Sequence, residues 1–166
     1  MSCNHRLKIT LLTISLLLPT SCLADIITGR VVAITDGDSI RILDSNNNQF
    51  KIRLIGIDAP EKKQAFGNVS KQSLSELVSG KIVNVNYSKR GRYGRIVGKV
   101  LLDNKDINLE QVKRGLAWHY KQYEREQDVA DRALYTQGEH IAQKANLGLW
   151  NDKNPVPPWD FRKMPH

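Results

Sequence analysis

Cysteine is scarce in this sequence: Cys3 and Cys22 are its two cysteines, and both stand within the first 24 residues. If the chain is cut after Ala24, the remainder contains no thiol and no disulfide. Such a domain has to be stabilised by a packed core instead of covalent cross-links. Cysteine-ligated metal centres are excluded there for the same reason.

Histidine is also sparse, and its positions show no paired spacing typical of metal ligands. The four histidines are His5, His119, His140 and His166. Any metal bound by this chain would therefore depend on carboxylate, carbonyl and water oxygens. Such hard ligands favour calcium or magnesium over zinc.

Long hydrophobic runs are lacking as well. The apolar run at residues 9–18 is too short to span a bilayer comfortably, which makes an uncleaved membrane anchor the weaker interpretation. Arg6 and Lys8 precede the run and small residues follow at 21–24, in the order of a secretory signal. We therefore predict a signal peptide over residues 1–24 and an exported protein, either periplasmic or secreted. A lipidated N-terminus at Cys22 is the alternative, although Pro19 fits that signal poorly.

Acidic residues are outnumbered by basic ones. The chain has 25 Lys and Arg against 17 Asp and Glu, a formal net charge of +8. A positive excess of this size favours a polyanionic partner, either nucleic acid or an anionic membrane surface, without choosing between them.

The hydrophobic period changes between about two and about 3.6 residues along the chain, which indicates strands and helices in one domain over residues 25–150. The predicted strands are 26–34, 39–43, 50–57, 81–87 and 94–102, and the predicted helices lie at 66–78, 107–114 and about 124–145. This order predicts an α+β, β-rich fold, a five-stranded OB-type barrel with about three flanking helices. In the Pro- and Trp-rich tail, 151–166, we predict no regular helix over 154–163, because proline lacks the amide donor.

Three short segments carry charges at predicted turns: the hairpin at 35–39, the segment RLIGIDAPE at 53–61 and the segment RGRYGR at 90–95. Taken singly, each has an ordinary explanation as a hairpin turn, a strand exit or a solvated loop. Their occurrence together favours a functional site. Asp36 is ambiguous, because it either supports that site from outside or caps the turn.

These motifs together resemble the staphylococcal nuclease family. The resemblance runs from about residue 27 to residue 150 and depends on DGDSI, RLIGIDAPE, FGNVSKQSL, YGR, INLEQVKRGLAWHY and NLGLW in this order. It implies an OB-barrel, calcium-dependent phosphodiesterase that cuts DNA and RNA and leaves 3′-phosphate ends.

The resemblance also implies roles for individual residues. It places metal-binding carboxylates at Asp38 and Asp58, a metal-binding backbone carbonyl at Ala59, a general base at Glu61 and phosphate-binding arginines at Arg53 and Arg95. Ala59 stands where the family often has Thr, and a backbone ligand survives that change.

Residues that contact the nucleotides are implied less directly. Tyr93 matches the aromatic residue beside the second arginine, and Tyr120 and Tyr123 are candidates for stacking on bases. Arg90 and Arg92 are expected to attract the polyanion without reading its sequence.

Electrostatics and strand geometry set two conditions for such a site. Three carboxylates about 5 Å apart repel by about 3 kcal/mol per pair at an effective dielectric near 20, and a divalent cation would offset this repulsion. Arg53 and Asp58 are five positions apart, so on an unbroken strand their side chains would face opposite sides. We therefore expect the strand to bulge or end at Gly56.

Two other classes of protein fit parts of the sequence. A noncatalytic OB module would bind nucleic acid through the same basic loop, but here all five charged positions of the catalytic set are present. A cationic, envelope-associated protein would explain export and charge and would leave the carboxylates unexplained. For the nuclease we expect a monomer acting on DNA and RNA.

We predict that the exported protein begins at Asp25, carries no thiol and stays folded in reducing agent. Intact-mass spectrometry of the purified protein checks the cleavage site, and circular dichroism with and without reductant checks stability. A mass that includes a lipid-modified Cys22 would contradict the simple signal peptide.

Overall fold

Five strands form the barrel in the computed structural model of the chain, which describes residues 25–91 and 94–165. They are β1 (Asp25–Asp36), β2 (Ser39–Leu43), β3 (Gln49–Leu54), β5 (Ile82–Arg90) and β6 (Ile96–Leu102). The first three form an antiparallel meander. β5 then pairs antiparallel with β1, and β6 pairs antiparallel with β5.

A parallel pairing between β3 and β6 closes the barrel. It places Ile52 opposite Ile96 and Leu54 opposite Gly98. Closure protects the edges of β3 and β6, as in other small barrels. The predicted OB-type barrel is thereby confirmed.

Alternation along β2 and β3 decides which side chains fill the barrel. Ile40 and Ile52 are opposite one another and almost completely buried, whereas the next pair, Arg41 and Lys51, is exposed. Because side chains alternate with a period of two, Arg53 belongs to the outward series that contains Lys51. The strand therefore delivers Arg53 to the surface of the barrel and not to its core.

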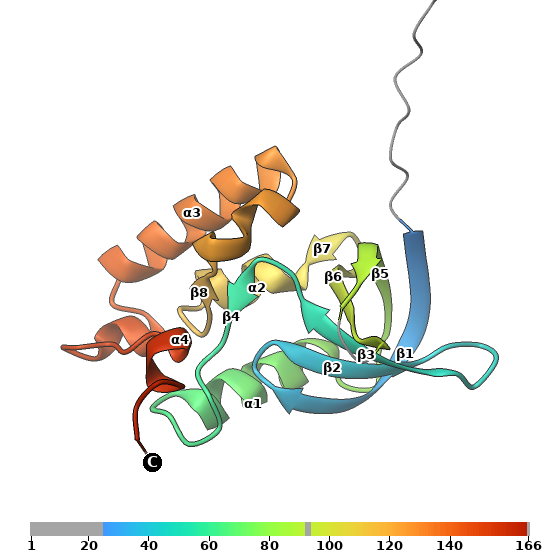
Figure 1. The fold of residues 1–166 in the computed structure, drawn as a ribbon, viewed down its shortest axis with the longest axis horizontal. Coiled ribbons are helices and arrows are strands. Elements are labelled where there is room, and N and C mark those ends of the chain that lie inside the picture. Colours follow the sequence, from blue (N-terminus) through green and yellow to red (C-terminus); the bar gives the residue numbers. More distant parts are fainter. Residues whose placement is uncertain (1–24, 92–93, 166) are drawn as a thin grey trace, which may run out of the picture.

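Three helices flank the barrel, as predicted (Figure 1). They are α1 (Gly67–Val78), α2 (Ile107–Lys113) and α3 (Val129–Lys144). α1 packs against β1, and α2 packs against both β6 and α3. Side-chain caps begin two of them: Asp106 accepts the Leu109 amide at 2.9 Å and Asp128 accepts the Ala130 amide at 2.9 Å.

Short elements connect these parts. β4 (Ile57–Asp58) pairs with β8 (Trp118–His119), and β7 (Lys105–Asp106) extends β6 into a hairpin. Two 3₁₀ segments, η2 (Lys121–Glu126) and η3 (Gly148–Asn151), precede and follow α3. The β4–β8 pair joins the exit of β3 to the helical side of the molecule.

Two predicted boundaries differ from the structure. The strand predicted over 50–57 ends at Leu54, because Gly56 has φ 76° and turns the chain before β4. The helix predicted from about residue 124 begins at Val129, after the capping residue Asp128. Residues 121–126 form η2 instead, and the extended backbone of Gln127 separates η2 from the start of α3.

The tail departs from the prediction that it holds no regular helix. One helical turn, α4 (Pro158–Phe161), begins with a proline at its first position. A proline costs little there, because the first amides of a helix have no intrahelical acceptor. Figure 1 shows α4, in red, against the side of the molecule that carries β4.

None of the helices within 25–91 and 94–165 combines the length and apolar character needed to cross a membrane. The predicted signal segment, 1–24, lies outside the described residues.

Candidate active site

Arg53 lies at the centre of a cluster of opposite charges. Its Nη1 contacts Asp38 Oδ1, and its Nη2 contacts Asp58 Oδ1 at 2.6 Å. Both carboxylates are about 1% exposed, and Arg53 itself is 21% exposed. Burial alone would lower the pKa of Arg53, but the charges of Asp38 and Asp58 raise it above its ordinary value. One guanidinium therefore joins two buried acids that come from different segments of the chain.

The turn after β3 brings Arg53 and Asp58 to the same side. Gly56 occupies the left-handed region, and a Cβ at this position would collide with the side-chain amide of Gln127. Glycine is thus required both for the backbone angle and for the close approach. The strand ends here, as the spacing of Arg53 and Asp58 predicted.

Buried hydrogen bonds hold this turn in place. Asn108 of α2 donates from Nδ2 to the Ile55 carbonyl at 3.0 Å and accepts the Val100 amide at 3.0 Å. The Tyr120 amide donates to the Gly56 carbonyl at 2.8 Å. Asn108 was not predicted to matter, because nothing local distinguishes it from a solvated helix residue.

Asp38 is held by the hairpin between β1 and β2 and by the chain after β4. Its Oδ2 accepts the Ala59 amide at 2.7 Å. Burial raises the pKa of Asp38 to about 8, although Arg53 and the Ala59 amide oppose that rise. Asp36 accepts the Asp38 amide at 3.2 Å, which is a turn-capping contact, and its side chain also lines the neighbouring cleft.

Glu61 stands on a loop that its neighbours immobilise. The Glu61 amide donates to Gln64 Oε1 at 3.1 Å, and the Gln64 amide donates to the Glu61 carbonyl at 2.8 Å. A Cβ on Gly67, the first residue of α1, would collide with that same carbonyl. The start of α1 therefore fixes the backbone that carries Glu61, while the Glu61 side chain stays 41% exposed.

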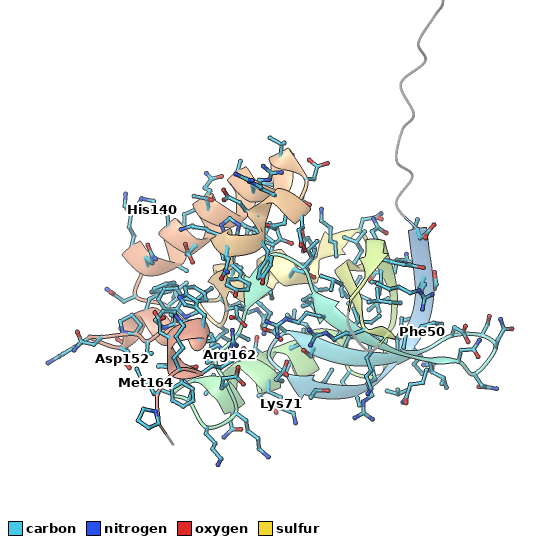
Figure 2. All side chains as sticks on the ribbon, in the orientation of Figure 1. Phe50, Lys71, His140, Asp152, Arg162 and Met164 are labelled. Carbon is cyan, nitrogen blue, oxygen red and sulfur yellow. The ribbon has the colours of Figure 1, made fainter. Side chains whose placement is uncertain are left out.

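Arg162 of the tail reaches the same carboxylates and was missing from the predicted site. Its Nη2 contacts Asp58 Oδ2 at 2.7 Å, and its Nη1 contacts Glu61 Oε1 at 2.7 Å. Hydrogen bonds to Asp58 and then to Glu61 raise the pKa of Arg162. Figure 2 labels Arg162 where the tail faces the centre of the molecule.

A cleft of about 670 Å³ opens above this cluster. Its charged and aromatic lining residues are Asp36, Arg53, Glu61, Arg95, Tyr120, Tyr123, Glu126 and Arg162. Arg95 is exposed and forms no ion pair with the described residues. The structure thus brings both predicted arginines, the predicted base and two of the predicted tyrosines to one cleft.

The remaining predicted contacts lie elsewhere or outside the described residues. Arg90 stands over the rings of Phe50 and Tyr87, at 6.0 and 5.9 Å from their centroids, and does not line the cleft. Arg92 and Tyr93 lie outside the described residues.

The donor set suits a hard cation. Asp38 and Asp58 supply carboxylate oxygens, and Ala59 is the residue next to Asp58. Asp38 Oδ2 accepts one bond from the Ala59 amide and Asp58 Oδ2 accepts one from Arg162, so each of these oxygens retains a further lone pair. The described residues hold no group of three or more His, Cys, Asp or Glu arranged around a metal position. A calcium ion that keeps several waters fits two carboxylates and a carbonyl.

Fold and site together define a closed five-stranded barrel with an arginine–carboxylate cluster at the exit of β3. The family model described as Staphylococcal nuclease homologue matches residues 51–152. The chain therefore belongs to the staphylococcal nuclease family, as the resemblance predicted.

Individual relatives agree with this assignment. An uncharacterized endonuclease of Haemophilus influenzae is 40% identical over 161 residues, covering 97% of this chain and 87% of that protein. An uncharacterized endonuclease of Escherichia coli is 44% identical over 135 residues, covering 81% of this chain and 84% of that protein. A staphylococcal-like nuclease of Arabidopsis thaliana is 38% identical over 115 residues, covering 69% of this chain and 34% of that one.

We predict that Asn108→Ala disturbs the site through the turn that it holds. The change leaves the Ile55 carbonyl and the Val100 amide without their buried partner, which lowers the free energy of unfolding by about 2 kcal/mol. It also lets Arg53 shift, so kcat of the folded variant falls about tenfold or more. Urea unfolding and single-substrate kinetics below the melting range measure the two effects.

Asn84→Ala is the matched control, because Asn84 is exposed on β5 and, among the residues that the structure describes, its amide oxygen accepts only the Thr28 hydroxyl, at 2.7 Å. Asn84→Ala should change neither the free energy of unfolding nor kcat appreciably. Native kcat in folded Asn108→Ala would contradict a positioning role.

Proposed function

We propose that this protein is a calcium-dependent phosphodiesterase, an endonuclease that hydrolyses DNA and RNA and leaves 3′-phosphate ends. The observation that carries the proposal is the position of Arg53, which lines a cleft together with Glu61 and Arg95 and is joined to the buried carboxylates of Asp38 and Asp58. Membership of a nuclease family and the endonuclease names of two relatives support the reaction class.

Asp38, Asp58 and the Ala59 carbonyl would hold the calcium ion. When bound, the ion supplies Lewis acidity toward a nonbridging phosphate oxygen and a template for the attacking water. Both carboxylates are buried, and backbone pairing holds the residues that carry them: the Asp38 carbonyl accepts the Leu54 amide at 2.8 Å, and Asp58 pairs with Trp118. The backbone positions of both ligands are therefore fixed before the ion binds.

Glu61 would act as the general base. Its carboxylate lines the cleft and is partly exposed, so it can reach a water that approaches a bound phosphate. The fixed loop between β4 and α1 limits the positions that this carboxylate can take. Glu61 takes the proton of the attacking water as the water oxygen bonds to phosphorus and the bond from phosphorus to the 5′ oxygen breaks. The leaving 5′ oxygen takes a proton from solvent, and the phosphate stays on the 3′ side.

Arg53 and Arg95 would bind the phosphate oxygens as negative charge accumulates on them. Arg53 uses two of its five N–H donors for Asp38 and Asp58, and the other three have no partner among the described residues. Arg95 forms no ion pair with an acidic residue in the described part of the chain. Guanidinium forks match phosphate oxygens bidentately, which an ammonium group cannot do.

The proposed contacts are to the phosphate groups, which DNA and RNA have in common. Arginine and metal contacts to phosphate do not read the base or the 2′-hydroxyl. Tyr120 and Tyr123 at the cleft wall would stack on bases, a contact that every nucleobase accepts. Arg90, which does not line the cleft, is proposed to attract the strand through its positive charge. Arg92 and Tyr93 are likewise proposed to contact the nucleic acid.

Export and monomeric action complete the proposal. The N-terminal signal pattern favours an exported enzyme. All proposed catalytic groups come from one chain, which supports activity without a partner subunit.

Calcium should support cleavage better than magnesium. The site offers oxygen ligands and room for phosphate and water, whereas magnesium demands a rigid octahedral shell. Digestion of plasmid DNA and of RNA with calcium, magnesium, zinc or chelator measures this preference. Fragments that a polymerase extends only after phosphatase treatment would carry the expected 3′-phosphate. Full activity in chelator, or with zinc alone, would refute this metal site.

Glu61→Gln should lower kcat by about 10²-fold or more, because the amide keeps the shape and loses the proton affinity. Arg95→Lys should lower kcat by a similar factor, because it keeps the charge and loses the fork. Initial rates at saturating DNA measure both, and filter binding in chelator checks that affinity for DNA survives.

Glu76→Gln on α1 and Arg41→Lys on β2 are the matched controls, and both should leave kcat near native. Near-native turnover by Glu61→Gln and Arg95→Lys would reject the mechanism. Binding of DNA with no cleavage under any metal would instead favour the noncatalytic OB module.

A further inference from the structure

The tail inserts a positive charge into the cleft. Arg162 contacts Asp58 through both of its terminal nitrogens, at 2.7 Å from Nη2 to Oδ2 and at 3.4 Å from Nη1 to Oδ1. The same Nη1 donates to Glu61 Oε1 at 2.7 Å. Arg162 is 42% exposed, so its guanidinium spans the boundary between the buried cluster and solvent.

Contacts on both sides of Arg162 dock the tail. The Trp159 ring stacks on Tyr120, with centroids 5.2 Å apart and an interplanar angle of 13°, and meets the edge of Trp118 at 5.6 Å. Gln64, which also binds the backbone of Glu61, donates to the Val156 carbonyl. The docked tail therefore touches the aromatic wall of the cleft and the loop of the proposed base.

The tail occupies groups that the reaction requires. Asp58 is a proposed metal ligand, Glu61 is the proposed base, and Tyr120 is proposed to stack on a nucleobase. While Arg162 is docked, the lone pairs of Asp58 and Glu61 that face it are already used as acceptors. Trp159 covers one face of the Tyr120 ring in the same way that a base would.

We propose that the C-terminal segment 157–164 is an intramolecular competitor of the divalent cation and of the nucleic acid, with Arg162 as its tethered cation. This inference rests on the proposed function and adds a regulation of the same site. In the closed state the guanidinium neutralises Asp58 and Glu61. Docked Arg162 opposes cation binding, because the guanidinium and the divalent cation compete for the Asp58 carboxylate. Withdrawal of the tail frees Glu61 from Arg162 and the Tyr120 ring from Trp159.

A tethered competitor lowers the apparent affinity for calcium. The tether keeps Arg162 at a high effective concentration beside its carboxylates. When only a fraction of molecules is open, the apparent dissociation constant rises by the reciprocal of that fraction. A docked population of about nine in ten would therefore weaken calcium binding about tenfold. The enzyme would stay closed where calcium is scarce.

Isothermal titration with calcium alone, without substrate, tests the competition. We expect Arg162→Gln to bind calcium about tenfold more tightly than the unchanged protein. Lys163→Gln is the matched control, because Lys163 is exposed and, within the described part of the chain, its Nζ pairs only with Asp160 Oδ1, at 3.0 Å. It removes the same charge one residue away and should leave the affinity unchanged.

Trp159→Ala separates docking from simple charge removal. This variant keeps Arg162 and loses the stack on Tyr120, so it should also bind calcium more tightly. Circular dichroism confirms that each variant is folded before titration. Unchanged affinity in Arg162→Gln, or tighter binding in Arg162→Gln with no change in folded Trp159→Ala, would overturn the competition by a docked tail.

Hydrogen exchange gives a readout that is independent of affinity. The backbone amides of α4 report whether the tail is docked, since the Phe161 amide donates to the Pro157 carbonyl and the Arg162 amide to the Pro158 carbonyl, both at 3.0 Å. Calcium should speed exchange across 157–164 in the unchanged protein and leave α2 unaffected. No calcium effect on these amides would overturn the withdrawal of the tail.

The outcomes separate this inference from the proposed function. Equal calcium affinity with weaker DNA binding in Arg162→Gln would make Arg162 a phosphate contact, and the nuclease proposal would stand without the competition. If neither the unchanged protein nor Arg162→Gln binds calcium or cleaves DNA, the calcium-dependent function itself fails, and the competition fails with it.

Discussion

The ion pairs of Arg53 with Asp38 and Asp58 are the interaction on which the rest of the site depends. Two carboxylates buried to about 1% exposure need a cation within reach, and Arg53 supplies one from the outward series of β3. Removing one partner of a buried ion pair costs about 3–5 kcal/mol, because the other charge is left uncompensated. The cluster therefore links separate segments of the chain and also forms a site that favours positive charge.

The barrel and helices satisfy the conditions that this cluster sets. β3 has to end just after Arg53, and the turn at Gly56 has to return the chain so that Asp58 faces the same guanidinium. Asn108 ties that turn to α2 and β6, so a helix far along the chain helps to fix a buried polar site. The hydrogen bonds of Asn108 stabilise the fold mainly because, without them, the Ile55 carbonyl and the Val100 amide would be buried without a partner.

Arg162 of the tail supplies a second positive charge to the buried Asp58. Arg53 contacts Oδ1 of Asp58, and Arg162 makes its shorter contact with Oδ2. The same carboxylate that would bind a metal ion also binds the guanidinium of Arg162, because the tail places that group beside it. The aromatic contacts of Trp159 with Tyr120 and Trp118 allow that placement, because they dock α4 beside the cleft.

Much of this protein was determined by local sequence. Alternation in β2 and β3, helical spacing over 66–78 and the turn residues predicted the OB-type barrel, and the motif order predicted the family, because each signal lies within a few residues. The pairing of β3 with β6, the bond from Asn108 to Ile55 and the docking of Arg162 were decided only by tertiary structure. Each joins positions more than 40 residues apart, and neither spacing nor composition encodes which distant polar groups will meet.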